Sequence, residues 1–218
     1  ISCSFNAANN VLGGDITWDR IVPGTFTFQL RLDVQCGGSA IGTSQIINVT
    51  NHPSVLSFTV NLVSTTDISP SCTSGTPITC ATGGSGAVTE YIFKSANIIL
   101  PGVPPAGGWV FTWSSCCRTP NTNLNIGGNS GITLWSKMYS YGGSSTALYT
   151  DNSADFVIIP KTIACTNTTN VINFGPYDSD LDSVDIQFGK PYDDFMGNFN
   201  PPVSPAPMSY NSGYSFTN

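Results

Sequence analysis

Charged residues are scarce in this chain. Asp, Glu, Lys and Arg make up 9% of its 218 residues, and only seven residues are Lys or Arg, which leaves a net charge of −6. Proteins that bind nucleic acid neutralise its phosphates with a stripe of basic side chains. Seven scattered cations cannot form such a stripe, so the composition argues against a nucleic-acid partner.

Long apolar runs are missing as well. No stretch of about 18 consecutive apolar residues occurs, and an α-helix needs roughly that length to cross a bilayer. We therefore predict no membrane span. Aromatic residues nevertheless reach 11%, which is more than disordered chains carry. The chain has enough apolar mass for a packed core.

The sequence also lacks the motifs of common enzymes. It has one histidine, His52, and no CxxC pair, GxSxG, HExxH or phosphate-binding glycine loop. His52 lies in NHPS and has no evident partner to orient it. Asp193 and Asp194 are adjacent, so their side chains are expected to face apart rather than to act as an acid–base pair. We predict that the chain is not an enzyme.

Alternation of apolar and polar residues with period two is abundant. In TFTFQLRLDVQC, residues 25–36, apolar side chains alternate with polar ones from Phe26 to Val34, and Cys36 continues the apolar face. Successive side chains of a strand point to opposite faces, so this segment predicts a strand with one buried face. SVLSFTVNLV repeats the pattern with Leu56, Phe58, Val60 and Leu62. Further strands are expected at 15–18, 44–50, 88–100, 108–116, 131–139 and 155–160.

Gly, Pro and Asn clusters separate these segments, which favours an all-β fold: an antiparallel β-sandwich, Ig-like, over residues 1–158. The composition changes near residue 160, where the chain becomes acidic and then rich in Pro and Asn. Residues 159–218 are too few for a second sandwich of about 100 residues. We expect them to form a partial β-module that continues beyond the chain or is completed by another chain.

The cysteines favour disulfides over a metal site, because disulfides suit an oxidising compartment. Strand alternation turns Cys36 and Cys117 inward, which suggests that they pair, and turns Cys116 outward. Cys72 and Cys80 bracket a short loop, TSGTPIT, and a local bridge would close it. Spacing alone leaves the connectivity open. The seven cysteines are Cys3, Cys36, Cys72, Cys80, Cys116, Cys117 and Cys165.

Three segments carry a family resemblance: GGDITW at 13–18, FTFQLRLDVQC at 26–36 and WSSCCRTPNTNL at 113–124. They resemble the opening domain of large secreted proteins of Bacteroidetes, described as gliding-motility-associated or PKD-domain cell-surface proteins. The acidic stretch at 163–194 and the Pro-rich end, PPVSPAPMSYNSGYSFTN, are also similar to that family. The double-cysteine segment is the most specific part of the resemblance.

The resemblance implies an extracellular, cell-surface protein exported by the type IX system, with a cadherin- or PKD-like module in its second part. Where the family has a second late cysteine, this chain has Gly189, so Cys165 lacks its usual partner, and Cys3 is an extra cysteine. A Cys3–Cys165 bridge would account for both departures and would leave Cys116 over.

The stretch YDSDLDSVD offers a candidate calcium site. Asp178, Asp180, Asp182 and Asp185 lie within eight residues, and Ca²⁺ takes six to eight oxygen ligands. The family resemblance suggests a cadherin-like calcium loop, although EF-hand spacing is absent. The alternative is a solvated turn before a strand at Val184, Ile186 and Phe188. The motif DSV also makes Ser183 a candidate for O-glycosylation of the Bacteroidetes type.

Two further features have competing interpretations. Arg118 could clamp a carboxylate, but an anchor on nearby backbone carbonyls is favoured. The aromatic residues around 109–141 could form a sugar-stacking platform, but alternation places Trp109 and Trp113 in the core. Trp135 lies off the apolar face of its strand and is the open case.

We therefore expect a non-catalytic structural or adhesive module of a bacterial surface protein. Its expected partners are itself or neighbouring modules, and surface glycans. The alternatives are a self-assembling filament subunit completed by strand exchange and a carbohydrate-binding module. No cofactor is expected other than Ca²⁺.

Overall fold

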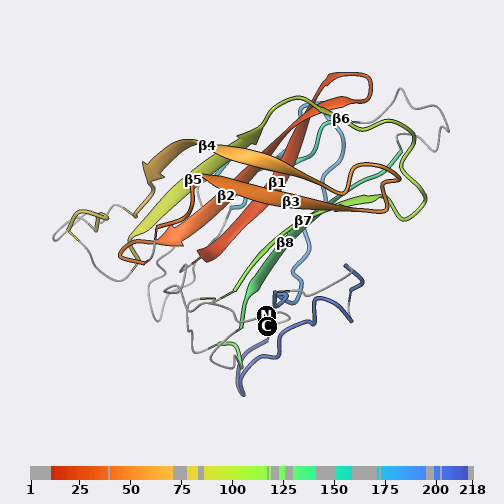
Figure 1. Cartoon of the computed structure of the whole chain (residues 1–218). Helices are drawn as coiled ribbons and strands as arrows, with labels where there is room; N and C mark the ends of the chain where they lie inside the picture. The colour runs from red at the N-terminus through yellow and green to blue at the C-terminus, as the bar shows by residue number, and fades with distance from the viewer. Residues whose placement is uncertain are drawn as a thin grey trace, which may run out of the picture.

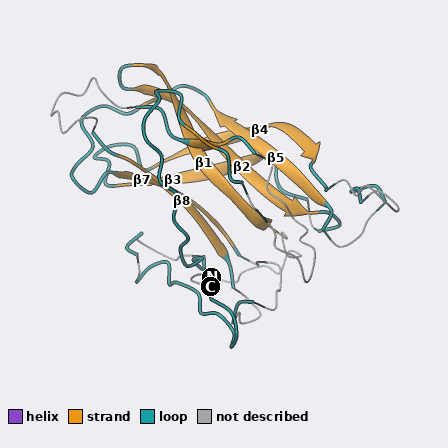
Figure 2. Cartoon of the chain, turned by 180° about the vertical axis from the view of Figure 1, so that it is seen from behind, coloured by secondary structure: helices purple, strands orange, loops and turns teal. Residues whose placement is uncertain are grey.

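The computed structural model describes residues 11–38, 40–70, 78–82, 86–116, 118, 123–125, 130–140, 151–158, 171, 173–194, 199–201 and 203–215. These residues form strands and loops, with no helix among them (Figure 2). The strands are β1 Val11–Val22, β2 Thr25–Gln35, β3 Ser44–Thr50, β4 Ser57–Asp67, β5 Val88–Ser95, β6 Ile98–Ile99, β7 Trp109–Ser115, β8 Ile132–Met138, β9 Asp155–Phe156 and β10 Pro176–Tyr177.

The core follows from the alternation in β2. Phe26, Phe28, Leu30, Leu32 and Val34 are all buried, and they pack against aromatic rings that neighbouring strands supply. The ring of Phe28 lies 4.6 Å from the rings of both Phe58 in β4 and Phe111 in β7. Burial of such large apolar side chains is the main stabilising contribution to the fold.

One antiparallel sheet contains the long strands, in the order β1-β2-β5-β4-β3-β7-β8, with β6 beside β2 (Figure 1). The sheet curves until its two edge strands, β1 and β8, approach each other. Six antiparallel pairings separate β1 from β8 along this path. The two edges therefore run in the same direction. In the described part of the chain no ladder joins them, so a seam remains between them.

Residues 151–156 lie along the β1 side of this seam. The Ser153 amide donates to the Trp18 carbonyl at 3.0 Å, and the Arg20 amide donates to Asn152 Oδ1 at 2.7 Å. Further on, the Phe156 carbonyl accepts from Arg31, which pairs with Asp15 across the β1–β2 ladder. The segment thus runs antiparallel to β1 and occupies the place of one more strand.

The region after β10 packs against the start of β8, where it contacts the backbone of Gly131. Asp193 Oδ1 accepts a hydrogen bond from the Gly131 amide. A Cβ at Gly131 would lie 2.4 Å from the Cβ of Asp194, so only glycine permits this close approach. The Met208 amide donates to the Pro191 carbonyl at 2.9 Å. Residues 191–194, 199–201 and 203–211 form irregular loops at this end of the sheet (Figure 1).

The predicted fold class is confirmed. The fold is all-β, antiparallel and sandwich-like, with a sheet that is nearly closed. The strand expected at 44–50 is found with those bounds, and those expected at 108–116 and 131–139 are each trimmed by one residue at either end. The expected strand at 88–100 is two strands, β5 and β6, because two residues of irregular backbone interrupt it.

Two expectations about strands are wrong. Leu56 was expected on a buried face, but it is 71% exposed and lies just before β4 begins. The strand expected at Val184, Ile186 and Phe188 is irregular chain, and Phe188 is 70% exposed. Alternation alone does not make a strand where no neighbouring strand offers a ladder.

The disulfide connectivity also differs from the prediction. Cys36 is bonded to Cys80, with a Cα–Cα distance of 5.3 Å, so the expected pairs Cys36–Cys117 and Cys72–Cys80 are both wrong. Cys36 follows β2, and its amide donates to the Ala87 carbonyl just before β5, which brings it to the loop that carries Cys80. Cys3, Cys72, Cys117 and Cys165 lie outside the described residues. Cys116 is exposed, as strand alternation predicted.

Candidate functional site

The seam between β1 and β8 holds two adjacent hollows, both of which Ile16 and Ala154 line. The inner cavity has a volume of about 460 Å³ and lies beside Trp18, Met138 and residues 151–154. The outer groove has a volume of about 720 Å³. Its lining comes from residues 14–17 of β1, residues 133–135 of β8, Ala154, Phe156, residues 189–192 and Tyr210.

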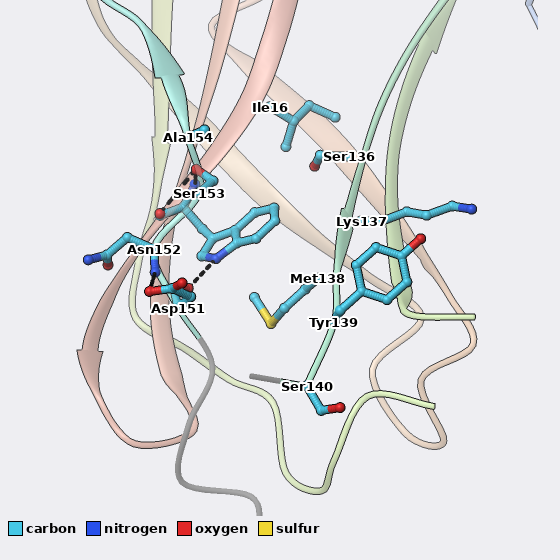
Figure 3. A pocket seen from close by; sticks show the side chains of 11 residues that line it. Ile16, Ser136, Lys137, Met138, Tyr139, Ser140, Asp151, Asn152, Ser153 and Ala154 are labelled. Atoms are coloured by element: carbon cyan, nitrogen blue, oxygen red, sulfur yellow. Dashed lines mark hydrogen bonds between the residues drawn. The ribbon is translucent and has the colours of Figure 1, made fainter. Parts of the chain in front are cut away.

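The inner cavity is bounded by a hydrogen-bonded contact between Trp18 and residues 151–153. The Trp18 amide donates to Ser153 Oγ at 2.7 Å, and its indole Nε1 donates to the Asp151 carbonyl at 2.8 Å. Figure 3 shows Ser136, Met138 and residues 151–154 around this space. Within the described part of the chain, the buried Ser136 hydroxyl has no hydrogen-bond partner. Hydrogen bonds between Trp18 and residues 151–153 therefore form one wall of the cavity.

The outer groove displays aromatic rings from both sides of the seam. Trp135 projects from the outer face of β8 and is 40% exposed. Its ring packs on Phe199 with centroids 5.6 Å apart, and Lys137 Nζ lies 5.3 Å from its centre. Phe156 is 39% exposed on the opposite wall. These rings are held in place yet remain accessible to a ligand.

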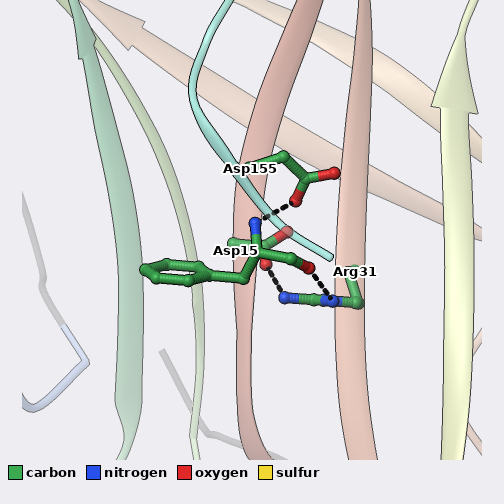
Figure 4. A network of polar contacts seen from close by, with 4 residues as sticks. Asp15, Arg31 and Asp155 are labelled. Carbon is green, nitrogen blue, oxygen red and sulfur yellow. Dashed lines mark hydrogen bonds and ion pairs between the residues drawn. The ribbon is translucent and has the colours of Figure 1, made fainter. Parts of the chain in front are cut away.

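An ion pair forms one wall of the groove. Asp15 and Arg31 are bonded to each other on the outer face of the sheet, and Arg31 Nη1 donates to the Phe156 carbonyl at 3.1 Å (Figure 4). Burial raises the pKa of Asp15 to about 6, against the opposing effect of Arg31. Among the described residues, no hydrogen-bond partner is found for the buried Oδ1 of Asp15. Arg31 thus joins β1, β2 and the segment at the seam.

A second buried carboxylate, Asp33, lies on β2, two residues after Arg31. Its side chain is 7% exposed, and Glu90 is its cross-strand neighbour on β5. Burial raises the pKa of Asp33 to about 6, the Arg31 charge opposes this effect, and the Glu90 charge adds to it. This outer face therefore carries more negative charge than its single guanidinium balances.

The predicted calcium residues form a turn that binds its own backbone. Asp178 Oδ1 accepts from the amides of Asp180 at 2.9 Å and Asp182 at 3.3 Å, while Asp185 Oδ2 accepts from Gln187 at 2.7 Å. Among the described residues, no three His, Cys, Asp or Glu side chains form a metal-binding group. The calcium site stays a prediction, as does glycosylation of Ser183.

Asp151 joins this turn to the seam. Burial, together with hydrogen bonds and charge from Asp180 and Asp182, raises the pKa of Asp151 to about 7. The Asn152 amide also donates to Asp180 Oδ2 at 2.9 Å. The acidic turn is therefore part of the structure that holds residues 151–156 against β1.

The remaining polar candidates are engaged with the backbone. His52 Nδ1 accepts from the amides of Ser54 and Val55, at 3.2 and 2.9 Å. Arg118 donates to the carbonyls of Gly131 and Tyr192, both at 3.0 Å, which confirms its expected role as an anchor. Trp109 and Trp113 are buried as predicted. Tyr141 lies outside the described residues.

Sequence reasoning missed the seam and most residues that line it. Neither the segment GGDITW, which contains Asp15, nor residues 151–154 indicated a site, because their importance depends on which two strands become the edges of the sheet. The sequence did indicate Trp135. It alternates with the apolar residues of its strand, and this position predicted that its side chain is exposed. Tyr192 and Tyr210 lie in irregular chain, where alternation says nothing about position.

Within the described part of the chain, no helix is long and apolar enough to cross a membrane. Comparisons with protein-family models, with curated proteins and with solved structures found no match for this chain. The resemblance to Bacteroidetes surface proteins therefore stays a prediction, and the function must be argued from the site.

Proposed function

We propose that this chain is a non-catalytic structural and adhesive module of a secreted surface protein. One observation carries the proposal: three polar side chains that the sequence offered for chemistry hold backbone groups in place. His52 accepts hydrogen bonds from two backbone amides, and Arg118 donates hydrogen bonds to two backbone carbonyls. Asp193 accepts a hydrogen bond from the Gly131 amide. What remains accessible is a groove lined by aromatic rings, which suits binding rather than catalysis.

The disulfide supports an extracellular setting for this module. The Cys36–Cys80 bond belongs to a class of cross-link that persists in oxidising compartments and is rare in reducing ones. Scarce charge and abundant Ser, Thr and Asn agree with a surface that packs against neighbours. Export by the type IX system and a role in gliding rest on the family resemblance alone.

Surface display tests the adhesive function. Cells of a non-adherent bacterium that display this module should be retained on polysaccharide-coated or protein-coated surfaces under flow. Cells that display an unrelated β-sandwich should wash off. Equal loss of both cell types from every coating would contradict the proposal, and so would turnover of a glycoside, ester or peptide substrate that disappears in His52→Ala.

Strand exchange between copies is the second candidate function, and residues 151–156 favour it. This segment takes the place of a strand at the seam, yet in the described part of the chain its backbone is joined to the backbone of the sheet by the hydrogen bond at Trp18. The same segment of another copy could occupy the same place. Cysteines at Thr17 and Ala154 should then give a disulfide-linked dimer; an intramolecular bond alone would contradict exchange.

A further inference from the structure

We propose that the outer groove binds an oligosaccharide, with Trp135 as the platform on which a sugar ring stacks. The inference rests on the proposed adhesive function and names the ligand class and the place where it binds. The groove volume of about 720 Å³ lies within the usual range of about 300–1,000 Å³ for small-molecule sites. A short oligosaccharide fits this space.

The aromatic rings supply the apolar half of a sugar site. A pyranose ring carries C–H groups on its faces and hydroxyls around its rim, so it stacks on an aromatic face while its rim stays polar. Trp135 and Phe156 expose 40% and 39% of their surfaces at the groove. Packing on Phe199, which is buried, holds the indole of Trp135 in position before any ligand arrives, and preorganised groups lose less entropy on binding.

Polar groups lie close to these rings. Asp15 and Thr17 face the groove from β1, and Thr133 faces it from β8. The Thr133 hydroxyl already donates to the Asp193 carbonyl at 2.5 Å, which leaves its oxygen lone pairs to accept. Within the described part of the chain, Asp15 Oδ1 has no hydrogen-bond partner, and a buried acceptor without a donor is costly. Sugar hydroxyls both donate and accept, so they match this mixture.

Charge and strand edges argue against other occupants. Lys190 is the one lysine or arginine among the residues that line the groove, and the Asp15 carboxylate is already paired with Arg31. Nucleic acid would need many more cations. An extended peptide would add to a free strand edge, but the β1 edge is engaged by residues 151–153. An uncharged, hydroxyl-rich ligand is what remains.

Calorimetric titration of the whole chain with hexasaccharides tests the site. The probes are the uncharged hexamers of β-1,4-glucose, β-1,3-glucose, β-1,4-xylose and N-acetylglucosamine. We expect at least one probe to bind, and Trp135→Ala to weaken it at least tenfold while Trp135→Phe keeps most of the affinity. Gly189→Leu should weaken binding of that probe as much. Gly189 lines the groove and a Cβ there meets nothing within 4 Å, so the leucine is accommodated by the fold and fills space that the sugar needs.

Two matched controls separate blockage of the groove from general damage. Gly13→Leu adds the same side chain at a glycine that also has open space, but outside the groove. Tyr139→Ala removes an exposed ring that lines the inner cavity instead. Both should bind within twofold of the natural chain. Binding that tolerates Gly189→Leu but is lost in Tyr139→Ala would overturn the assignment to the outer groove.

The two proposals fail in different ways. If no hexasaccharide binds but displayed cells still adhere to a protein coating, the sugar site is overturned and the adhesive function stands. If a hexasaccharide binds with the expected losses in Trp135→Ala and Gly189→Leu while displayed cells adhere to nothing, the site is supported and the adhesive function is overturned. Adhesion to polysaccharide that Gly189→Leu abolishes supports both.

Discussion

At the scale of single residues, the buried carboxylates on the outer face make stability depend on pH. The pKa of Asp33 is about 6 in the folded chain, against an ordinary value of 3.8. The folded state therefore keeps its proton at pH values where the unfolded chain has lost it. The free energy of unfolding should fall as pH rises from about 4 to about 6 and then stay level. Asp15, also raised to about 6, acts in the same direction.

Replacing Asp33 tests this linkage. Asp33→Asn keeps the shape of the side chain and removes the buried charge, so it should gain on the order of 2 kcal/mol at about pH 8 and little at about pH 4. Urea denaturation at the two pH values measures the difference. Asp19→Asn, at an exposed position on β1, is the control. A gain of equal size at both pH values would contradict the burial argument.

The disulfide gives a second prediction for single residues. Cys36 and Cys80 close a loop with a sequence separation of 44 residues, and loop entropy alone gives such a cross-link up to about 4 kcal/mol. Cys36→Ser, Cys80→Ser and the double variant should therefore lose equal stability, measured by thermal unfolding. Additive losses, or a mapped peptide that links Cys36 to Cys117, would show that the pairing is wrong.

Single residues also show where sequence reasoning succeeds. The burial of Phe26, Phe28 and Trp113 and the exposure of Trp135 follow from alternation, because the side-chain period of a strand is two wherever it pairs. The partner of Cys36 does not follow, because a disulfide depends on which loops the sheet order brings together. The register between β2 and β5 decides that, and it involves residues more than fifty positions apart.

At the scale of elements, residues 151–156 are held to β1 by few groups, so each contributes measurably. Ser153→Ala removes the acceptor of the Trp18 amide, and a buried donor left unpaired costs about 1–3 kcal/mol. We expect a loss of that size and faster hydrogen exchange at the Trp18 amide. Ser153→Thr keeps the hydroxyl and should preserve both properties. Unchanged exchange in Ser153→Ala would mean that the segment is not bound there.

The acidic turn offers a prediction about calcium. Asp151 and Asp180 share a hydrogen bond that lowers the pKa of Asp180 and contributes to the raised pKa of Asp151. A cation at the predicted calcium residues would replace the proton that this pair holds. Millimolar Ca²⁺ should then raise the melting temperature relative to EDTA, and the shift should vanish in Asp180→Asn. An identical melting temperature in Ca²⁺ and EDTA would remove calcium from the account.

Elements with strong alternation could be predicted and the closing segment could not. The strand at 44–50 was identified with its observed bounds because it lies between partners in the sheet. A strand was expected at 155–160, and the described residues of this segment, 155–158, contain the two-residue strand β9, which pairs with β10. Its hydrogen bonds go partly to side chains, and a pattern of apolar residues does not report such bonds.

At the scale of the whole molecule, the number and order of the antiparallel strands determine where the site lies. Seven strands in antiparallel order leave β1 and β8 parallel, and among the described residues no ladder joins these two edges where they approach each other. An extra antiparallel segment fills the seam only in part, and the outer groove lies beside it. The position of the groove therefore follows from the sheet order rather than from any local motif.

The four tryptophans allow the most direct test of the claim that this groove recognises a ligand. In an ¹⁵N–¹H spectrum each indole gives one signal, and the Nε1 groups of Trp18 and Trp113 are fixed by bonds to the Asp151 carbonyl and to Gln45 Oε1. Titration with the hexasaccharide that binds in calorimetry should shift the Trp135 signal and leave the Trp113 signal in place. A titration that shifts Trp18 while Trp135 stays unchanged would contradict the account.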